Sequence, residues 1–168
     1  APVRIAFETT VLYAEHVTIH EEERWVLLDR AVRVEREDTT ITADQARLEI
    51  DDDVYVFEGS VHVIEEKENR REIWANHMEY HGETGNITAE GNVRMEEEAR
   101  RFNAQRMVYD AEAETAVLEG DVVVVDDQAE IVAQRLDINL REETFAGSGP
   151  GRIVLFEIRK SSGESDGE

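Results

Sequence analysis

One pattern recurs along the chain: an alanine is followed 16 residues later by a glycine. Counted from a weaker first copy at Ala14, where Arg30 replaces the glycine, the alanines are 29, 32, 29 and 29 residues apart. A register kept over this length is typical of a repeat protein, in which each unit stacks on its neighbours. The full pairs are Ala43 and Gly59, Ala75 and Gly91, Ala104 and Gly120, and Ala133 and Gly149.

Each repeat has the sequence pattern of a β-hairpin. In the fourth copy Phe102 and Ala104 alternate with polar residues, and so do Met107 and Tyr109, with a step of three between the two pairs. The return half keeps period two through Ala116, Leu118, Gly120, Val122 and Val124. Because the step of three recurs, we expect a bulge or corner in every first strand, with the glycine opposite it.

Stacked hairpins with aligned corners predict an all-β fold: an elongated, open, folded sheet of about five tandem hairpin repeats with no significant helix. The parity relative to the repeated glycine places one set of apolar residues on a single inner face, which we expect to be a continuous apolar trough. A plain packed sandwich core is the alternative. The inner-face residues are Phe57, Val61, Val63, Val93, Met95, Leu118, Val122, Val124, Leu136 and Ile138.

The rest of the chain fits one unit. We expect residues 1–159 to form a single domain and the acidic tail, residues 160–168, to be disordered. Turns are expected at residues 21–24, 51–53, 82–86 and 141–144. The polar stretch 65–72 is expected to be the longest connection, and the glycine-rich stretch 147–151 breaks regular pairing near the end.

Composition excludes several classes of protein. With 18 Lys and Arg against 40 Asp and Glu, the net charge of -22 argues against nucleic acid as a partner. The acidic residues are spread over turns and alternate strand positions, which indicates a solvated outer face. There is no cysteine, hence no disulfide. No apolar run is long enough to span a membrane, and no signal peptide is visible, although export is compatible with the sequence.

Motifs for catalysis or metal binding are weak. His77 and His81 are four apart, which suits metal ligands on a helix but not on the strand expected here. Residues 51–53, three aspartates, lack the spacing and glycine of a calcium loop. Residues 147–151 (GSGPG) precede no helix that could hold a phosphate. We therefore expect no enzyme activity, no metal and no cofactor.

The repeat resembles that of the OstA-like, LptA-type family of periplasmic lipopolysaccharide transport proteins. The most typical segment is Ile87–Met95 (ITAEGNVRM), and Ile73–Ala75 (IWA) and Phe102–Tyr109 (FNAQRMVY) fit as well. The resemblance spans residues 14–153 and rests on several repeats. It departs from the pattern at Arg30 and at the glycine-rich break.

The resemblance implies a β-jellyroll, open along one side, in which the ten inner-face residues line a groove for lipopolysaccharide acyl chains. It also implies a periplasmic location and end-to-end contacts between jellyrolls that form a bridge to the outer membrane. The soluble bridge component is favoured over the N-terminal domain of the outer-membrane translocon and over the soluble part of the membrane-tethered component. A structural β-repeat scaffold without a ligand stays the alternative from another class.

Assembly is expected at the two ends of the stack, where edge strands leave backbone groups free to pair. The ends differ in sequence, so pairing between them would be heterologous and would give a filament or bridge, with other jellyroll proteins or with copies of this chain. The edge-strand residues are Val3, Ile5 and Phe7 at one end and Ile153 and Leu155 at the other.

Overall fold

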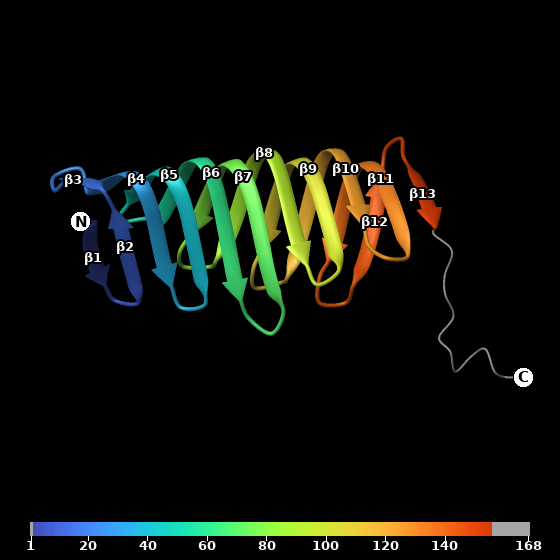
Figure 1. The fold of residues 1–168 in the computed structure, drawn as a ribbon, viewed down its shortest axis with the longest axis horizontal. Helices are drawn as coiled ribbons and strands as arrows, with labels where there is room; N and C mark the ends of the chain where they lie inside the picture. Colours follow the sequence, from blue (N-terminus) through green and yellow to red (C-terminus); the bar gives the residue numbers. More distant parts are fainter. Residues whose placement is uncertain (1, 156–168) are drawn as a thin grey trace, which may run out of the picture.

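The computed structural model describes residues 2–155, so the expected tail at 160–168 lies outside the described residues. The fold is all-β, as the repeat predicts, and its strands stack along one long axis (Figure 1). Among residues 2–155 no helix is long and apolar enough to cross a membrane. The strands are β1 (Val3–Phe7), β2 (Thr10–Ala14), β3 (His16–His20), β4 (Trp25–Arg36), β5 (Thr39–Glu49), β6 (Val54–Glu66), β7 (Arg70–His81), β8 (Asn86–Glu97), β9 (Arg100–Asp110), β10 (Thr115–Val125), β11 (Ala129–Asn139), β12 (Thr144–Ser148) and β13 (Arg152–Leu155).

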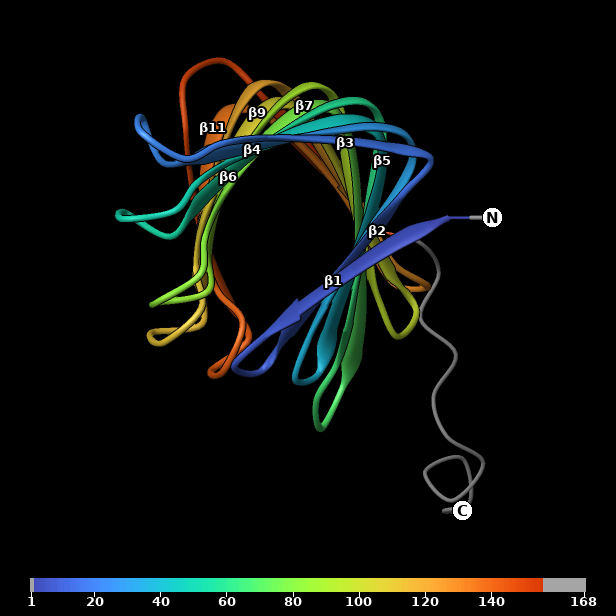
Figure 2. The same ribbon diagram turned by 90° about the vertical axis from the view of Figure 1, so that its left-hand side faces the viewer.

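All strands belong to one antiparallel sheet, in which β4 to β12 follow chain order. Each long strand turns a corner near its middle, so the sheet folds into two half-sheets around a common interior (Figure 2). Half-sheet 1 contains segments such as Thr115–Glu119 of β10, together with β3 and β12. Half-sheet 2 contains segments such as Val122–Val125, together with β1, β2 and β13. The result is the open jellyroll that the family resemblance implies.

The corner lies where the sequence predicts it, but the bulge lies on the other strand. Between β9 and β10, Glu119 pairs with Arg106 and Val123 with Asn103, so the extra residue is on β10, the strand with the glycine. Gly120 has a φ of 86° and Asp121 one of 49°. A side chain at Gly120 would place its Cβ 2.8 Å from Gln105, closer than carbon atoms approach. The first strand of the hairpin contains no extra residue, and only its in–out alternation shifts at the corner.

The first repeat makes the same corner without glycine. Arg30 has a φ of 72° and Ala31 one of 52°, both in the left-handed region that disfavours residues with a Cβ. Opposite this corner the expected single strand is split into β2 and β3, which pair with different halves of β4. The end repeat therefore keeps the corner while its outer strand is interrupted.

The stretch 65–72 is not a long connection. β6 continues to Glu66 and β7 begins at Arg70, so only residues 67–69 connect them. The charged residues of this stretch pair across the ladder, Glu65 with Arg71 and Glu66 with Arg70. The turns expected at 51–53 and 82–86 do lie between strands, at 50–53 and 82–85.

The corner of the first repeat can be tested by Arg30→Gly. Glycine adopts positive φ without a steric cost, so we expect the free energy of unfolding to rise by about 1 kcal/mol, offset in part by the larger entropy of the unfolded chain. Thermal or urea unfolding measures this change. Arg33→Gly, in the regular part of the same strand, is the control and should destabilise; a destabilised Arg30→Gly would contradict the strain at this corner.

Candidate functional site: an apolar interior closed by a polar seam

The inner face of the jellyroll is apolar through every repeat. All ten residues assigned to it from the sequence are buried, with at most 3% of their surface exposed. The alternation is confirmed at β10, where Val122 and Val124 are buried while Val123 and Val125 are half-buried on the outer side. That these side chains contact lipid stays a prediction.

The expected open trough is filled by its own side chains. Residues from the two half-sheets meet in the middle, as Phe102 of half-sheet 2 and Phe145 of half-sheet 1 do with ring centroids 6.3 Å apart. Tyr55, Phe57 and Met95 are fully buried. The half-sheets must therefore separate or their side chains rearrange before a chain molecule can lie between them.

The open side of the jellyroll is a seam between two rows of turns. Half-sheet 1 ends at the turns 21–24, 50–53, 82–85, 111–114 and 140–143, and half-sheet 2 at the turns 37–38, 67–69, 98–99 and 126–128. Each backbone hydrogen bond between turns stays within one row: Gly82 N–H donates to Asp53 O in half-sheet 1, and Glu66 N–H donates to Asp38 O in half-sheet 2. Among residues 2–155 only side chains cross the seam.

Arg71 makes the most buried of these crossings. Only 4% of its side chain is exposed, and it donates to Glu97 at 2.8 Å and Glu65 at 3.3 Å on its own rim. Across the seam it donates to the Tyr109 hydroxyl at 3.0 Å and to Glu114 at 3.1 Å. The Tyr109 hydroxyl in turn donates to Glu65 at 3.1 Å. One guanidinium thus ties both half-sheets together.

The protonation of this cluster follows from its surroundings. Burial raises the pKa of Tyr109, and the Glu65 carboxylate raises it further, so the hydroxyl keeps its proton. Burial alone would lower the pKa of Arg71, but its anionic neighbours more than offset this and raise it. The hydrogen bond from Arg71 lowers the pKa of Glu114, which therefore stays ionised as the acceptor of this contact.

Two further arginines cross the seam. Arg36 donates to both carboxylate oxygens of Asp53, at 2.9 and 3.2 Å, and Arg100 donates to Glu143 at 3.4 Å. We call the contacts Arg36–Asp53, Arg71–Glu114 and Arg100–Glu143 the seam bridges. These hydrogen-bonded ion pairs hold the two half-sheets together at the seam. No apolar packing is needed there.

The sequence reasoning missed these residues, because it assigned Glu65 and Arg71 to a solvated connection. A signal was present in the repeat. Arg71 and Arg100 are 29 residues apart, as are Glu114 and Glu143, so the same basic and acidic types recur one repeat later. Repeated charges of opposite sign at fixed positions indicate a structural pairing.

The ends of the stack carry the predicted edge strands. Within residues 2–155, β1 pairs only with β2 and β13 only with β11. Val3 is 40% exposed, Ile5 is half-buried and Ile153 is 66% exposed; the side chains of Phe7 and Leu155 lie outside the description. An apolar cleft of about 400 Å³ lies between β12 and β13. The residues that line it include Ile131, Leu136, Phe145, Gly147 and Ile153.

Removal of Arg71 tests how much its cluster stabilises the fold. Arg71→Met keeps the aliphatic bulk but leaves Glu65 and Glu97 buried without their cation, which should cost about 3–5 kcal/mol of the free energy of unfolding. Urea unfolding at neutral pH measures the loss. The matched control is Arg101→Met, since Arg101 is 60% exposed and should change stability by less than about 0.5 kcal/mol. Equal effects of the two variants would contradict the role of Arg71.

Comparison with known proteins supports this architecture. The family model described as LptA/(LptD N-terminal domain) LPS transport protein matches residues 12–144. A search of curated proteins finds no match. Among solved structures, the chain is similar to LptH, the LptA homologous periplasmic component of the lipopolysaccharide transport device of Pseudomonas aeruginosa. That match has a TM-score of 0.63 and 13% identity, and covers 90% of this chain and 95% of LptH, so it establishes the fold.

Proposed function

The chain belongs to the LptA/LptD N-terminal domain family of lipopolysaccharide transport proteins, and from this premise we propose that it is a jellyroll segment of the periplasmic lipopolysaccharide bridge. Its interior would shield the acyl chains of lipopolysaccharide while its outer surface stays in water. The family role is transport, not catalysis. The periplasmic location follows the LptA homologue that the fold resembles.

One observation carries the proposal: the apolar inner face continues through every repeat from Leu12 to Ile138, beside a seam that no backbone ladder of residues 2–155 closes. A core that only stabilises the fold places no requirement on how the two half-sheets meet at the seam. A rim of side-chain contacts lets the two half-sheets part while each keeps its own backbone hydrogen bonds. Such an interior suits a long apolar guest that enters from the side.

The acidity of the chain defines which part of the lipid it contacts. Lipopolysaccharide is anionic, and a chain with a net charge of -22 repels phosphates over most of its surface. The acyl chains carry no charge and gain free energy when they leave water. We infer that the protein binds acyl chains and leaves the charged groups in solvent.

The closed packing of the interior favours a second candidate. Because the inner side chains of the two half-sheets already bury one another, a structural β-repeat scaffold with no ligand would have the same core. Within the transport system, LptA is our first choice, and the N-terminal domain of LptD or the soluble part of LptC are the alternatives. The family model itself covers both LptA and LptD.

Photo-crosslinking from the inner face separates the conduit from the scaffold. A photoreactive residue in place of Met95, which is fully buried, should crosslink to lipopolysaccharide in cell extracts, because acyl chains would lie against it. The same residue in place of the neighbouring Arg94, whose side chain is 43% exposed on the outer face, is the control. Crosslinks from neither position, or equally from both, would favour the scaffold.

Assembly through the ends is the second part of the proposal. In half-sheet 2, no strand of residues 2–155 pairs with the outer side of β1 or β13, so β13 of one jellyroll can add to β1 of the next. Pairing of unlike edges continues a sheet from one molecule into another. The apolar cleft beside β13 would bring the two interiors into contact.

Deletion of residues 153–168 tests this assembly. The variant should lose concentration-dependent oligomers in sedimentation and should capture fewer partner jellyrolls, because β13 is lost. Crosslinking from position 95 should persist, since that residue lies in the middle of the stack. Wild-type protein that stays monomeric at every concentration, with partner capture unchanged by the deletion, would contradict the end-to-end arrangement.

A further inference from the structure

The seam bridges of Arg71 and Arg100 follow the repeat, and the equivalent position one repeat before Arg71 has no such bridge. Arg71 and Arg100 each lie four residues before a repeat alanine, and Glu114 and Glu143 each lie six residues before a repeat glycine. The equivalent residues in the second repeat and the hairpin it faces are Thr39, four before Ala43, and Gly85, six before Gly91. Thr39 carries no charge and Gly85 has no side chain, so these two residues cannot form an ion pair.

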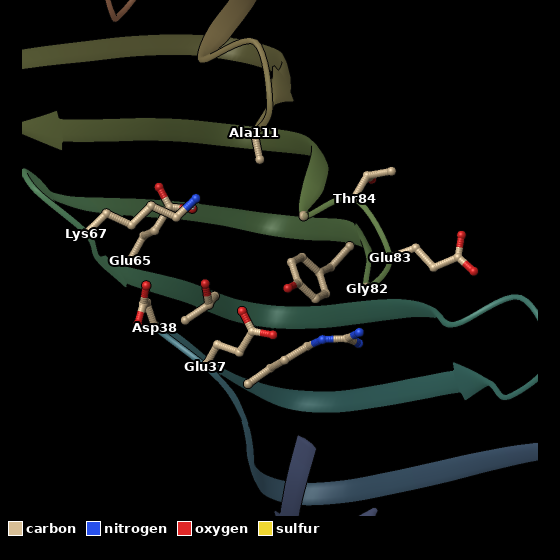
Figure 3. A pocket seen from close by; sticks show the side chains of 12 residues that line it. Glu37, Asp38, Glu65, Lys67, Gly82, Glu83, Thr84 and Ala111 are labelled. Carbon is tan, nitrogen blue, oxygen red and sulfur yellow. The ribbon is translucent and has the colours of Figure 1, made fainter. Parts of the chain in front are cut away.

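A cavity of about 180 Å³ lies at this missing bridge, between the bridges of Arg36 and Arg71. In Figure 3, Glu37, Asp38, Glu65 and Lys67 line one side and Gly82, Glu83 and Thr84 the other. Four carboxylates thus surround the cavity, against the two cations of Arg36 and Lys67. Arg36 is already held by Asp53, and Lys67 lies 3.6 Å from Glu65.

Tyr80 connects the cavity to the interior. It lines the cavity with only 5% of its surface exposed, and none of the hydrogen bonds found among residues 2–155 involves its hydroxyl. The ring packs against Tyr55 with centroids 5.8 Å apart, so a fully buried side chain of the interior lies directly against this wall of the cavity. A tyrosine hydroxyl at the boundary between an apolar interior and a polar cavity can donate a hydrogen bond to a ligand oxygen in that cavity.

We propose that the gap at Thr39 and Gly85 is a side port that holds the uncharged, hydrogen-bonding part of an acylated sugar whose acyl chains lie in the interior, with the Tyr80 hydroxyl donating to an oxygen of that part. The inference rests on the proposed function, because it needs acyl chains inside. The carboxylates of the rim can accept hydrogen bonds from sugar hydroxyls, whereas they repel a phosphate. Burial raises the pKa of Tyr80, so the donor keeps its proton at neutral pH.

Three probes separate the parts of the proposal: a diacylated glucosamine without phosphate, the same molecule with a phosphate, and diphenylhexatriene, an apolar fluorophore without a headgroup. Tyr80→Phe removes the hydroxyl and keeps the ring. It should weaken equilibrium binding of the diacylated glucosamine about threefold to tenfold, the effect of one hydrogen bond, and leave diphenylhexatriene unchanged. Tyr13→Phe, on the outer face, is the matched control and should change neither.

The repeat itself supplies a second variant, Thr39→Arg with Gly85→Glu, which completes the missing bridge. Gly85 has a φ of 81°, and the equivalent Glu114 and Glu143 adopt 55° and 59°, so a glutamate is accommodated at this turn. The filled port should weaken the diacylated glucosamine at least tenfold while diphenylhexatriene still binds. Thr40→Arg with Thr88→Glu makes the same charge changes at outward-facing positions of regular strands and should have no effect on either probe.

The outcomes distinguish the port from the function it rests on. If folded wild-type protein binds neither the diacylated glucosamine nor diphenylhexatriene, the proposed function fails. If both bind and the port variants leave the glucosamine affinity unchanged, the port is overturned and the function stands. Equal weakening of both probes by Tyr80→Phe, or a phosphorylated probe that binds more tightly than the unphosphorylated one, would also overturn the port.

Discussion

Two consecutive residues with positive φ at the middle of the return strand in each of the first four repeats determine the shape of the molecule. Gly91 and Asn92, for example, have φ values of 84° and 49°, and they bend a strand that would otherwise stay straight. Because the same pair recurs in successive repeats, the bends align and the sheet folds along one line. Without that line the apolar side of the sheet would face water, and burial of the inner face would need a second molecule.

The two margins of the folded sheet differ in chemistry. At the corner, each long strand continues from one half-sheet into the other, so the connection is covalent. At the seam they are joined by Arg36, Arg71 and Arg100 and by the Tyr109 hydroxyl, groups that water can also satisfy once they are exposed. A buried ion pair is weak evidence for stability, since apolar residues of the same size often serve as well. Charged contacts are therefore consistent with a margin whose opening is part of the function.

The sequence predicts most of the fold and little of the seam. The spacing of alanine and glycine predicts the stack, the corner and the inner side of β10, because side-chain alternation fixes which of Val122 and Val123 is buried. It does not tell which strand holds the bulge, since a step of three in one strand and a step of four in its partner produce similar patterns. It also presents Glu65 and Arg71 as solvent-exposed, because the partners that allow their burial lie some forty residues further along the chain. Whether the interior is open or filled depends on the distance between half-sheets, which periodicity does not encode.

The seam bridges also change how the stack unfolds. Backbone pairing among the described strands joins neighbours only, and an array of that kind loses its terminal units one at a time. Arg71, at the start of β7, is bound to the turn between β9 and β10, and Arg100, at the start of β9, to the turn between β11 and β12. Each bridge passes over an intervening hairpin, so one repeat cannot fray without breaking a contact of the next. We expect the array to gain cooperativity between non-adjacent units from these bridges, so that hydrogen exchange is coupled from β7 to β11.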